Sequence, residues 1–337
     1  MSHLAIGDYV YQGVFLQQLA ATYPHLQIDI WFDDCRDNTK TWHSGRNQIL
    51  SQWLESEPNI GTLYPNPSSP KQRQQQLTQA QNAQYDIVFF IATQRSERFC
   101  KYARQIAGDN FAAGAYLLSP WQKLCNSAHI KALDASISIK ESAQFDHISE
   151  FYQHHFGALI EMPQPAFAFQ QLQVPQSYLA AVQSSQSTDN LVFINHLSTT
   201  HKRDWQLSQV LDCIRAMHHR QPNLQFIINA PTEMLPALES ELQATDLEGI
   251  RVTTFSAKQH FFQLPAMISH AKIVISVETA IMHLAASLGV PAVALIREKA
   301  HHWRPLGPGE VLVGSKRVDS ISAQTVADKA LALLANA

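Results

Sequence analysis

The stretch that most constrains the fold reads KIVISVETAIMHLAASLGVPAVALI and lies close to the C-terminus. It opens with Lys272–Ser276, a β-branched run bounded like a buried parallel strand. Thr279–Leu288 is rich in Ala, Met and Leu, which favour a helix, and Gly289 with the proline two residues later ends that helix. Ala292–Ile296 then resumes as a strand. A strand, a short helix and a second strand predict a right-handed crossover in a parallel sheet.

The turn inside this stretch, Ser276–Thr279, lies where open α/β sheets bind their ligands. Free amides at the start of a helix also attract phosphate. A matching turn is expected at Gly7-Asp8, between a short first strand at Leu4–Ile6 and a helix at Tyr9–Thr22. The sequence therefore predicts two ligand-facing turns, one near each end of the chain.

Composition excludes several classes of protein. The chain has 337 residues, of which 45% are hydrophobic and 16% charged, as in an ordinary globular enzyme of about two domains. Its 25 Lys and Arg residues against 28 Asp and Glu residues give a net charge of −3, which argues against a nucleic-acid partner. The 16 histidines show no metal-ligand spacing, so no metal is expected.

The cysteines and the lengths of the apolar runs indicate the cellular compartment in which we expect the protein. The four cysteines are scattered without a C-x-x-C pair, as in reduced thiols of a cytosolic protein. No signal-peptide pattern and no apolar run of about 18 residues is found, so we expect neither export nor a membrane span. The glycine fingerprints of dinucleotide-binding and P-loop proteins are also missing, which argues against dehydrogenases and P-loop kinases.

Short apolar strands alternate with helical segments along the chain, in two series separated by a stretch that holds Pro163, Pro165 and Pro175. This pattern predicts an α/β fold of two Rossmann-like domains, with parallel sheets facing an interdomain cleft. The further strands expected are Leu26–Phe32, Ile60–Tyr64, Tyr85–Ala92, Leu191–Asn195, Gln225–Asn229, Arg251–Phe255 and Val311–Val313. The expected domains are 1–160 and 181–322, with a linker at 161–180 and a C-terminal helix at 323–337.

A cationic stripe follows the strand at Tyr85–Ala92. Arg95, Arg98, Lys101 and Arg104 recur every three residues, which places them along one face of a helix. Such a stripe is either a solvated surface or a docking site for a phosphorylated or anionic acceptor. Both interpretations remain open.

Four motifs in a fixed order span most of the chain. They are Ile6-Gly7-Asp8 with Tyr23-Pro24 and Ile28-Asp29, Lys202-Arg203 with Trp205, Ala230-Pro231-x-Glu233, and Glu278-Thr279-Ala280-x-x-His283 continuing to Gly289-x-Pro291. Together they resemble glycosyltransferase family 9, the ADP-heptose:lipopolysaccharide heptosyltransferases. Five features depart from the family pattern: Glu278 replaces Asp, Ala280 replaces Gly, two residues rather than one separate Lys202 from Trp205, Arg297-Glu298-Lys299 replaces Gly-Pro-Thr, and the first strand is unusually short.

The resemblance implies a GT-B fold and an inverting, metal-independent transfer of heptose or a related sugar. The expected donor is a nucleotide sugar, ADP-heptose, with no further cofactor, and the expected acceptor is lipopolysaccharide or another anionic glycolipid or glycan. The enzyme is expected in the cytoplasm, with peripheral contact to the inner membrane. Two alternatives remain open: the same fold acting on a protein acceptor, and a sugar-nucleotide-binding protein without transfer activity.

For the chemistry, the resemblance implies Asp8 as the catalytic base. In the alternative interpretation Asp8 only caps a helix. Lys202 would hold the donor diphosphate as a mobile point charge, with neighbouring Arg203 able to serve instead, or it is a plain surface cation. Ser198 and Thr199 line the turn before Lys202 and are weaker donor-binding candidates.

The C-terminal motif supplies the remaining donor-binding candidates. Thr279 and the amides that follow it, from Ala280 onward, would meet the diphosphate. Glu278 and Glu233 would accept hydrogen bonds from sugar or ribose hydroxyls, or else only stabilise the start of a helix. His283 lies one turn after Thr279 and would contact the donor, or it is an ordinary core histidine.

Overall fold

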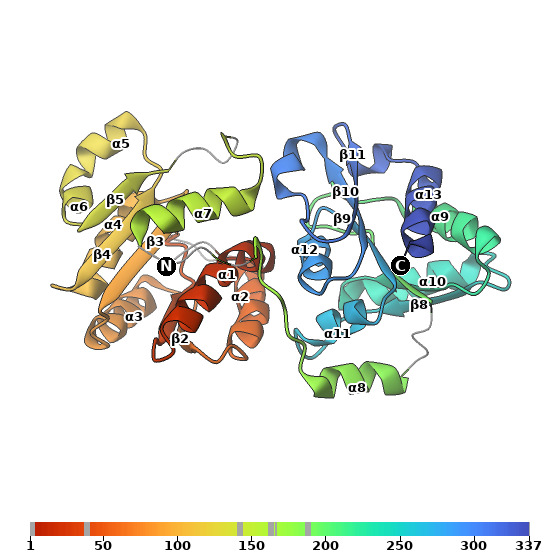
Figure 1. Cartoon of the computed structure of the whole chain (residues 1–337), viewed down its shortest axis with the longest axis horizontal. Coiled ribbons are helices and arrows are strands. Elements are labelled where there is room, and N and C mark those ends of the chain that lie inside the picture. Colours follow the sequence, from red (N-terminus) through yellow and green to blue (C-terminus); the bar gives the residue numbers. More distant parts are fainter. Residues whose placement is uncertain are drawn as a thin grey trace. The chain divides into compact units, whose positions relative to one another are not determined.

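The computed structural model describes residues 4–36, 41–139, 144–160, 165, 167–185 and 190–336, apart from the side chains of 41–46 and 185. The chain forms two compact units, Met1–Ala168 and Phe169–Ala337 (Figure 1). The division falls inside the stretch 161–180, where the sequence predicts a linker. Within the described residues, no helix combines the length and apolar character needed to cross a membrane.

The second unit is built on one six-stranded parallel sheet in the order β11-β10-β9-β6-β7-β8. This is the doubly wound order, in which the first strand of the unit, β6, lies in the middle between β7 and β9. The strands are β6 Leu191–Asn195, β7 Gln225–Asn229, β8 Arg251–Phe255, β9 Ile273–Val277, β10 Ala292–Arg297 and β11 Gly309–Gly314.

Helices cover both faces of this sheet. On one face Val293 and Leu295 of β10 join a buried cluster with α9 and α13, which lie side by side (Figure 1). On the other face Ala294 and Ile296 pack with Met282 of α12. The helices of this unit are α8 Gln176–Ser185, α9 Leu207–Arg220, α10 Leu235–Ala244, α11 Gln263–Ser269, α12 Ala280–Ser287 and α13 Ala323–Ala335, with short 3-10 helices at η2 Thr232–Met234, η3 Glu298–Trp303 and η4 Val318–Ser320. The strands β6, β9 and β10 are buried on both faces, which explains their continuous apolar sequences.

The strand–helix–strand unit predicted at the C-terminal motif is confirmed as β9, α12 and β10, with β9 and β10 parallel. Gly289 has φ of +70°, the left-handed conformation expected just after a helix. After β10 the chain continues directly into the 3-10 helix η3. The stretch therefore forms the local structure that its sequence predicts, and it places its turn at the carboxyl end of the sheet.

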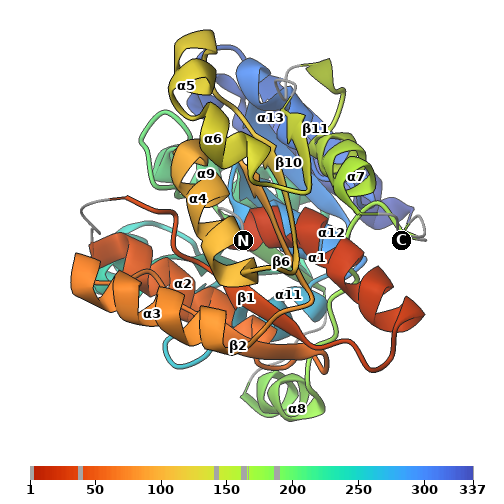
Figure 2. The same ribbon diagram turned by 90° about the vertical axis from the view of Figure 1, so that its left-hand side faces the viewer.

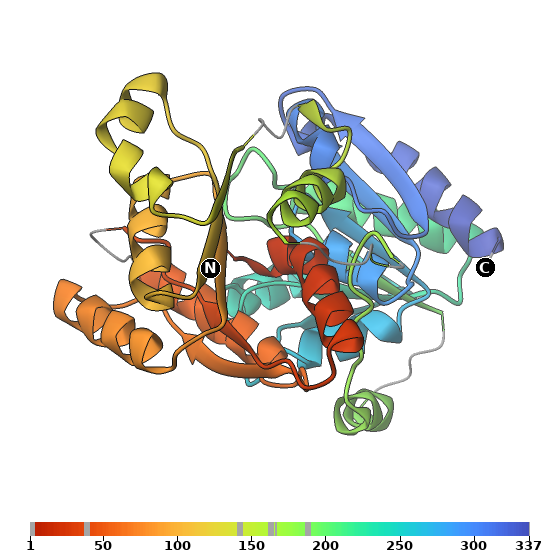
Figure 3. The same cartoon turned by 60° about the vertical axis from the view of Figure 1, so that its left-hand side comes forward.

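The described residues of the first unit form five strands in two separate parallel sheets, β1-β2 and β3-β4-β5. The helices α1 and α7 lie side by side, and Figure 3 shows α4 on the opposite side of the sheet β3-β4-β5 from them. The helix α3 lies beside α4 (Figure 2). The elements are α1 Ile6–Thr22, β1 Ile28–Trp31, α2 Thr41–Leu54, β2 Ile60–Tyr64, α3 Pro70–Asn82, β3 Ile87–Ala92, α4 Ser96–Ala107, β4 Phe111–Tyr116, α5 Pro120–Cys125, α6 Ser127–Lys131, β5 Ala135–Ser138 and α7 Ile148–Leu159.

The prediction of a first strand at Leu4–Ile6 is wrong, because α1 already begins at Ile6. Gly7 and Asp8 accordingly lie in the first helical turn and not in a strand-to-helix turn. The Asp8 carboxylate accepts the backbone N–H of Ala5 at 3.1 Å, which satisfies a donor that the start of a helix leaves unpaired. This local bond favours helix over strand at these residues.

Candidate active site

A hydrogen-bonded polar network lies at the carboxyl ends of β6, β7 and β9. Asn195 Nδ2 donates to Thr279 Oγ1 at 3.1 Å and lies 3.3 Å from Ser276 Oγ. Asn229 Nδ2 donates to Asn195 Oδ1 at 3.0 Å, and Thr279 Oγ1 accepts the backbone N–H of Ile281 at 3.3 Å. Thr279 is thus the N-cap of α12, and hydrogen bonds from residues at the strand ends fix its side chain. The network lies between β6 and β9, where the strand order reverses and doubly wound folds bind ligands.

Next to this network, two guanidinium groups converge on Glu278. Arg297 Nε and Nη2 donate to the two carboxylate oxygens of Glu278 at 2.9 and 2.8 Å. Arg203 Nε, from the loop after β6, lies 3.3 Å from Glu278 Oε1. Arg297 is buried, and its bond to Glu278 raises its pKa. Two cations against one carboxylate leave a net positive charge beside the N-terminus of α12, an arrangement suited to a phosphate group.

The 3-10 helix η3 follows β10 and brings His302 close enough for the Glu278 charge to act on it. Burial lowers the pKa of His302 even though the Glu278 carboxylate acts in the opposite direction. The next residue, Trp303, meets the ring of His283 edge-on, with centroids 6.2 Å apart. His283 is buried within α12. His283, which the sequence predicts to contact the donor or to be a core histidine, is therefore buried in α12 and packs against Trp303.

The loop after β6 is held by Asp204, which sequence reasoning did not single out. Its Oδ1 accepts the backbone N–H of Ser198 at 2.7 Å, and its Oδ2 lies 3.1 Å from His201 Nδ1. Thr199 and Lys202 are exposed on this loop. The backbone of the loop is thereby fixed, whereas the ammonium group of Lys202 stays in solvent as a movable charge.

His196 anchors the base of the same loop. Its Nδ1 lies 3.0 Å from the carbonyl oxygen of Trp205, and the Trp205 backbone N–H donates to the His196 carbonyl at 2.9 Å. Among the described residues its buried Nε2 has no hydrogen-bond partner. Burial lowers the pKa of His196, so the neutral ring is favoured in the folded protein.

The predicted donor-binding residues thus gather along one edge of the sheet. Glu278, Thr279 and Ala280 form the turn after β9, and Glu233 lies exposed on η2 after β7. Ser198, Thr199 and Lys202 lie in the loop after β6. Their roles toward a donor stay predictions.

Asp8 lies in the first unit, at the start of α1. Its Oδ1 accepts the hydroxyl of Tyr152 from α7 at 3.1 Å, while its Oδ2 accepts the N–H of Ala5. Tyr152 is buried, and burial together with the Asp8 charge raises its pKa well above the usual value. Asp8 itself is half-buried, and Ala5 rather than Asp8 is the N-cap. Its role as a base stays a prediction.

The cationic stripe is partly engaged within the protein. Arg95, at the N-cap of α4, donates from Nε to the carbonyl of Asp34 at 2.5 Å, and Arg98 Nη1 donates to the carbonyl of Cys35 at 2.6 Å. Both arginines therefore hold the segment that follows β1. Lys101 is exposed. Acceptor binding by Arg95, Arg98 and Lys101 stays a prediction, with Lys101 the best placed to meet a ligand.

Sequence reasoning missed Asn195, Asn229 and Arg297, although they share a visible signal. Each is the last residue of a buried apolar strand, namely β6, β7 or β10. A polar residue at that position points to the ligand-binding edge of a parallel sheet. Among the described residues, no group of three or more His, Cys, Asp or Glu side chains could hold a metal ion.

The sequence was compared with models of known protein families. Residues 127–330 match the model of glycosyltransferase family 9 (heptosyltransferase), which is more than half of the chain. The chain belongs to glycosyltransferase family 9. The family resemblance and the predicted enzyme class, a glycosyltransferase, are confirmed by this match. Among curated protein sequences, no significant match was found.

Solved structures agree with the fold expected for a family 9 member. A family 9 glycosyltransferase from Veillonella parvula is 16% identical, with a TM-score of 0.76 over 99% of this chain and 95% of its own. The E. coli ADP-heptose LPS heptosyltransferase II is 16% identical, with a TM-score of 0.72 over 99% and 98%. The E. coli heptosyltransferase WaaC with ADP is 15% identical, with a TM-score of 0.62 over 97% of both chains. The predicted α/β GT-B fold with parallel sheets is confirmed.

Proposed function

We propose that this chain transfers heptose or a related sugar from ADP-heptose to a lipopolysaccharide or other surface-glycan acceptor, with inversion at the anomeric carbon. The observation that carries the proposal is the cationic turn at the carboxyl edge of the second sheet. There Arg203 and Arg297 converge on Glu278, next to the N-terminus of α12. A nucleoside diphosphate presents the charge and oxygens that such a turn binds.

The similar structures support this choice of donor. One WaaC structure contains ADP, and another contains ADP-2-deoxy-2-fluoro heptose. In our proposal the donor diphosphate occupies the turn, with Lys202 folding over it from the loop after β6. Glu278 holds Arg297 through two hydrogen bonds and thereby fixes the position of that guanidinium group. Glu233 and the remaining acceptor capacity of Glu278 would contact hydroxyls of the nucleoside and sugar.

The transfer step requires a base and a stabilised leaving group. The acceptor hydroxyl attacks the anomeric carbon while Asp8 takes its proton, and the bond to the diphosphate oxygen breaks. The electrons of that bond leave with ADP. The guanidinium groups, Lys202 and the α12 amides neutralise the charge that develops on the diphosphate, so no metal ion is required in this proposal.

The first test is a thermal-shift screen of the full chain against ADP-heptose, ADP and UDP-linked sugars. A ligand at about 100 times its Kd adds about 2.7 kcal/mol of stability, so a specific donor gives a clear rise in Tm. We expect ADP-heptose and ADP to raise Tm and UDP-sugars to leave it unchanged. The opposite preference would refute the donor assignment.

The second test follows transfer by mass spectrometry, using ADP-heptose and a heptose-free lipopolysaccharide acceptor. We expect a heptosylated product at the same rate with and without EDTA. Inhibition by EDTA that Mg²⁺ reverses would contradict metal independence. Donor binding without transfer would favour the sugar-nucleotide-binding alternative, and product found only on polypeptide would favour a protein acceptor.

We further propose that the reaction takes place at the cytoplasmic face of the inner membrane, with peripheral contact. Co-sedimentation with vesicles of inner-membrane lipids tests this location. Binding that depends on an embedded acceptor is expected, and indifference to vesicles with and without acceptor would contradict it.

A further inference from the structure

The first unit carries an exposed apolar patch on α5 and on the loop that precedes this helix. Among the described residues, Trp121 and Leu124 are the two most exposed large hydrophobic side chains, with exposed fractions of 72% and 67%. They lie three residues apart and so share one face of α5, and Leu117 is exposed just before the helix. We call these three residues the α5 patch. Figure 1 shows α5 at one end of the first unit.

The α5 patch does not serve to hold α5 on the protein. None of the six residues of α5 is buried, and the helix is fixed by its ends instead. Ser119 Oγ accepts the backbone N–H of Gln122 at 3.3 Å, and Gln122 Oε1 accepts the backbone N–H of Ser119 at 3.0 Å. Asn126 Nδ2 donates to the Gln122 carbonyl at 2.8 Å. A short helix usually forms because it buries an apolar face, whereas here that face stays in solvent.

The chain around the α5 patch is basic. Residues 117–133 contain Lys123 and Lys131 and no Asp or Glu. Lys131, on α6, is exposed. The next acidic residue along the chain, Asp134, is paired with Arg104 at 2.9 Å. The patch therefore combines exposed apolar side chains with a local positive charge.

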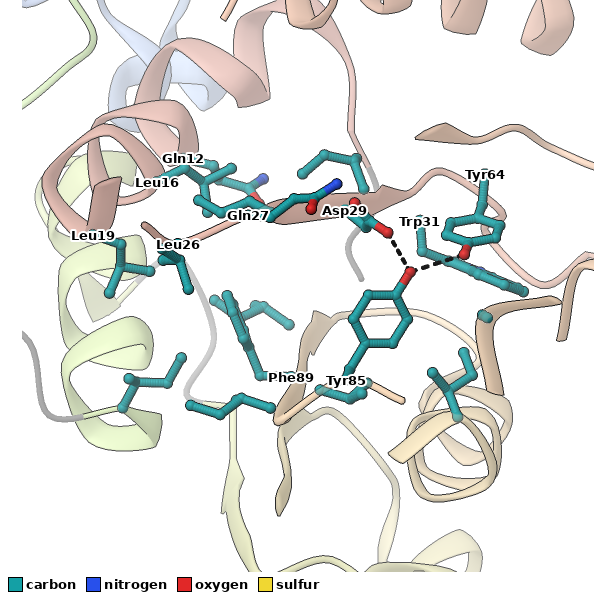
Figure 4. Close-up of a pocket in the computed structure, with 18 of the residues that line it drawn as sticks. Gln12, Leu16, Leu19, Leu26, Gln27, Asp29, Trp31, Tyr64, Tyr85 and Phe89 are labelled. Carbon is teal, nitrogen blue, oxygen red and sulfur yellow. Dashed lines mark hydrogen bonds between the residues drawn. The ribbon is translucent and has the colours of Figure 1, made fainter. Parts of the chain in front are cut away.

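A second apolar feature of the first unit has a different shape. A groove of about 290 Å³ lies between β1 and β3, with Trp31 and Phe89 among the residues that line it (Figure 4). The hydroxyl of Tyr85 donates to the Asp29 carboxylate in this groove. The groove is concave, whereas the α5 patch stands out into solvent. The patch is therefore suited to a broad, flat partner.

A membrane surface fits this combination of shape, apolar side chains and charge. Trp side chains favour the boundary between lipid headgroups and acyl chains, because the indole ring has both an apolar body and a polar N–H. Lys side chains meet the phosphates of anionic headgroups. A protein partner fits less well, because a stable protein interface covers about 800 Å² on each side, whereas one buried aromatic side chain supplies about 150–250 Å².

The α5 patch also lies next to the start of α4, the helix that carries the cationic stripe. Because β3 and β4 are parallel, Ser96 at the start of α4 and Leu117 after β4 lie at the same edge of the sheet. The backbone N–H of Leu117 donates to Ser96 Oγ at 3.0 Å. A membrane in contact with the patch would therefore lie beside the helix that holds Lys101, for which acceptor binding is predicted.

We propose that the α5 patch docks the protein on the headgroup region of a membrane that contains anionic phospholipid. Trp121 and Leu124 enter the boundary between headgroups and acyl chains, and Lys131 lies among the lipid phosphates. Lys123, whose ammonium group donates to Ser138 Oγ at 3.0 Å, adds its charge behind them. This docking rests on the peripheral membrane contact proposed above and names the surface that makes it. An acceptor embedded in the same membrane strengthens the contact.

The test is co-sedimentation of the full chain with vesicles that contain no acceptor. Vesicles of phosphatidylethanolamine with phosphatidylglycerol are compared with vesicles of phosphatidylcholine alone. We expect binding to the anionic vesicles only, and at least tenfold weaker binding by the double variant Trp121→Ser with Leu124→Ser. The double variant should keep its Tm, because both side chains are exposed. Phe111→Ser, at an exposed position at the amino end of β4, is the matched control and should bind as the unchanged chain does.

A second measurement follows the depth of Trp121 directly. Phospholipid that is brominated on its acyl chains quenches the fluorescence of tryptophan side chains that enter the membrane. We expect quenching of the unchanged chain and much weaker quenching of Trp121→Phe, although this variant still binds the vesicles.

Three outcomes would overturn the proposal. Equal binding by the double variant and the unchanged chain would show that another surface meets the lipid. Equal binding to phosphatidylcholine vesicles would exclude recognition of anionic headgroups. A dimer that dissociates in the double variant, seen by size-exclusion chromatography without any vesicle binding, would identify a second copy of the chain as the partner of the patch.

The outcome is separable from that of the proposed transfer, because these vesicles contain neither donor nor acceptor. Transfer to an acceptor without vesicle binding would refute the docking surface alone. Vesicle binding through the patch without any transfer would support the docking surface and refute the proposed function.

Discussion

Among the described residues, six parallel strands of the second unit form one sheet, whereas five strands of the first unit form two sheets with an apolar groove between them. Both units alternate strands and helices in the same order along the chain. The difference is one element: β6 leads into α9 in the second unit, and within the described residues no strand leads into α1 in the first. A doubly wound sheet is therefore held together by its central strand, because that strand pairs with two neighbours distant in sequence.

The largest effect is expected at Asp8, the one residue of the first unit to which we assign a chemical role. Replacing it, Asp8→Asn, should lower kcat by about 10²–10⁴-fold, because the acceptor hydroxyl loses its base. Donor affinity, measured by calorimetry with ADP, should stay unchanged because the proposed donor site lies in the second unit. Asp109→Asn, at an exposed position of the same unit, is the matched control. If Asp8→Asn turns over as fast as the unchanged chain, Asp8 is not the catalytic base and the first unit has no catalytic role.

The second prediction concerns the ion pair that supports the turn of the second unit. Arg297→Met leaves the mostly buried carboxylate of Glu278 without its two-bond partner and should cost about 3 kcal/mol of unfolding free energy. It should also weaken ADP binding. Arg220→Met, which removes an exposed pair with Asp328, should cost at most about 1 kcal/mol. Urea denaturation compares the two variants, and equal costs would show that the Glu278 pair is an ordinary surface contact.

A third prediction compares the two sheets directly. Native-state hydrogen exchange should be at least tenfold faster in β1 and β3 than in β6 and β9, because β1 and β3 each pair with one strand only in the part of the chain that the structure describes. The full chain is used at one pH and temperature for all four strands. If the four strands exchange at the same rate, the split sheet does not weaken the first unit.

A smaller effect is expected from pH in the second unit. Burial lowers the folded-state pKa of His196, so the unfolded chain binds a proton there more readily. The associated stability is fully present above the unfolded pKa, about 6.5, and is lost as pH falls from there toward the folded pKa. His196→Asn should therefore give a shallower loss of unfolding free energy between about pH 7 and 5. An unchanged slope would exclude His196 as a source of the pH dependence.

The smallest effect on stability is expected at the cationic stripe of the first unit. Lys101 is exposed, so Lys101→Ala should change unfolding free energy by no more than about 0.5 kcal/mol. If the stripe binds an anionic acceptor, the same variant should raise the KM for acceptor and leave the KM for donor unchanged. Arg95→Ala is the contrasting variant, because Arg95 holds the segment after β1 and its loss should lower Tm as well.

Sequence reasoning was most accurate in the second unit. The boundaries predicted for β6, β7 and β8 match the structure. For β6 and β7 the reason is that buried parallel strands are continuous apolar runs between polar turns. The left-handed conformation of Gly289 was also predictable, because glycine has no Cβ atom to disfavour a positive φ and this preference is local to the residue. At Leu4–Ile6 the same reasoning failed, because three residues carry too little pattern to separate a strand from the first turn of a helix.

The sequence by itself determined the alternation of strands and helices, the family, and the turn that ends β9. These depend on local hydrophobic pattern and on residues with strong backbone preferences. Only the tertiary structure decided that Arg203 and Arg297 meet at Glu278, that Asn195 and Asn229 support Thr279, and that the first sheet is divided. Each of these joins residues far apart in the chain, and strand order rather than local sequence sets which of them become neighbours.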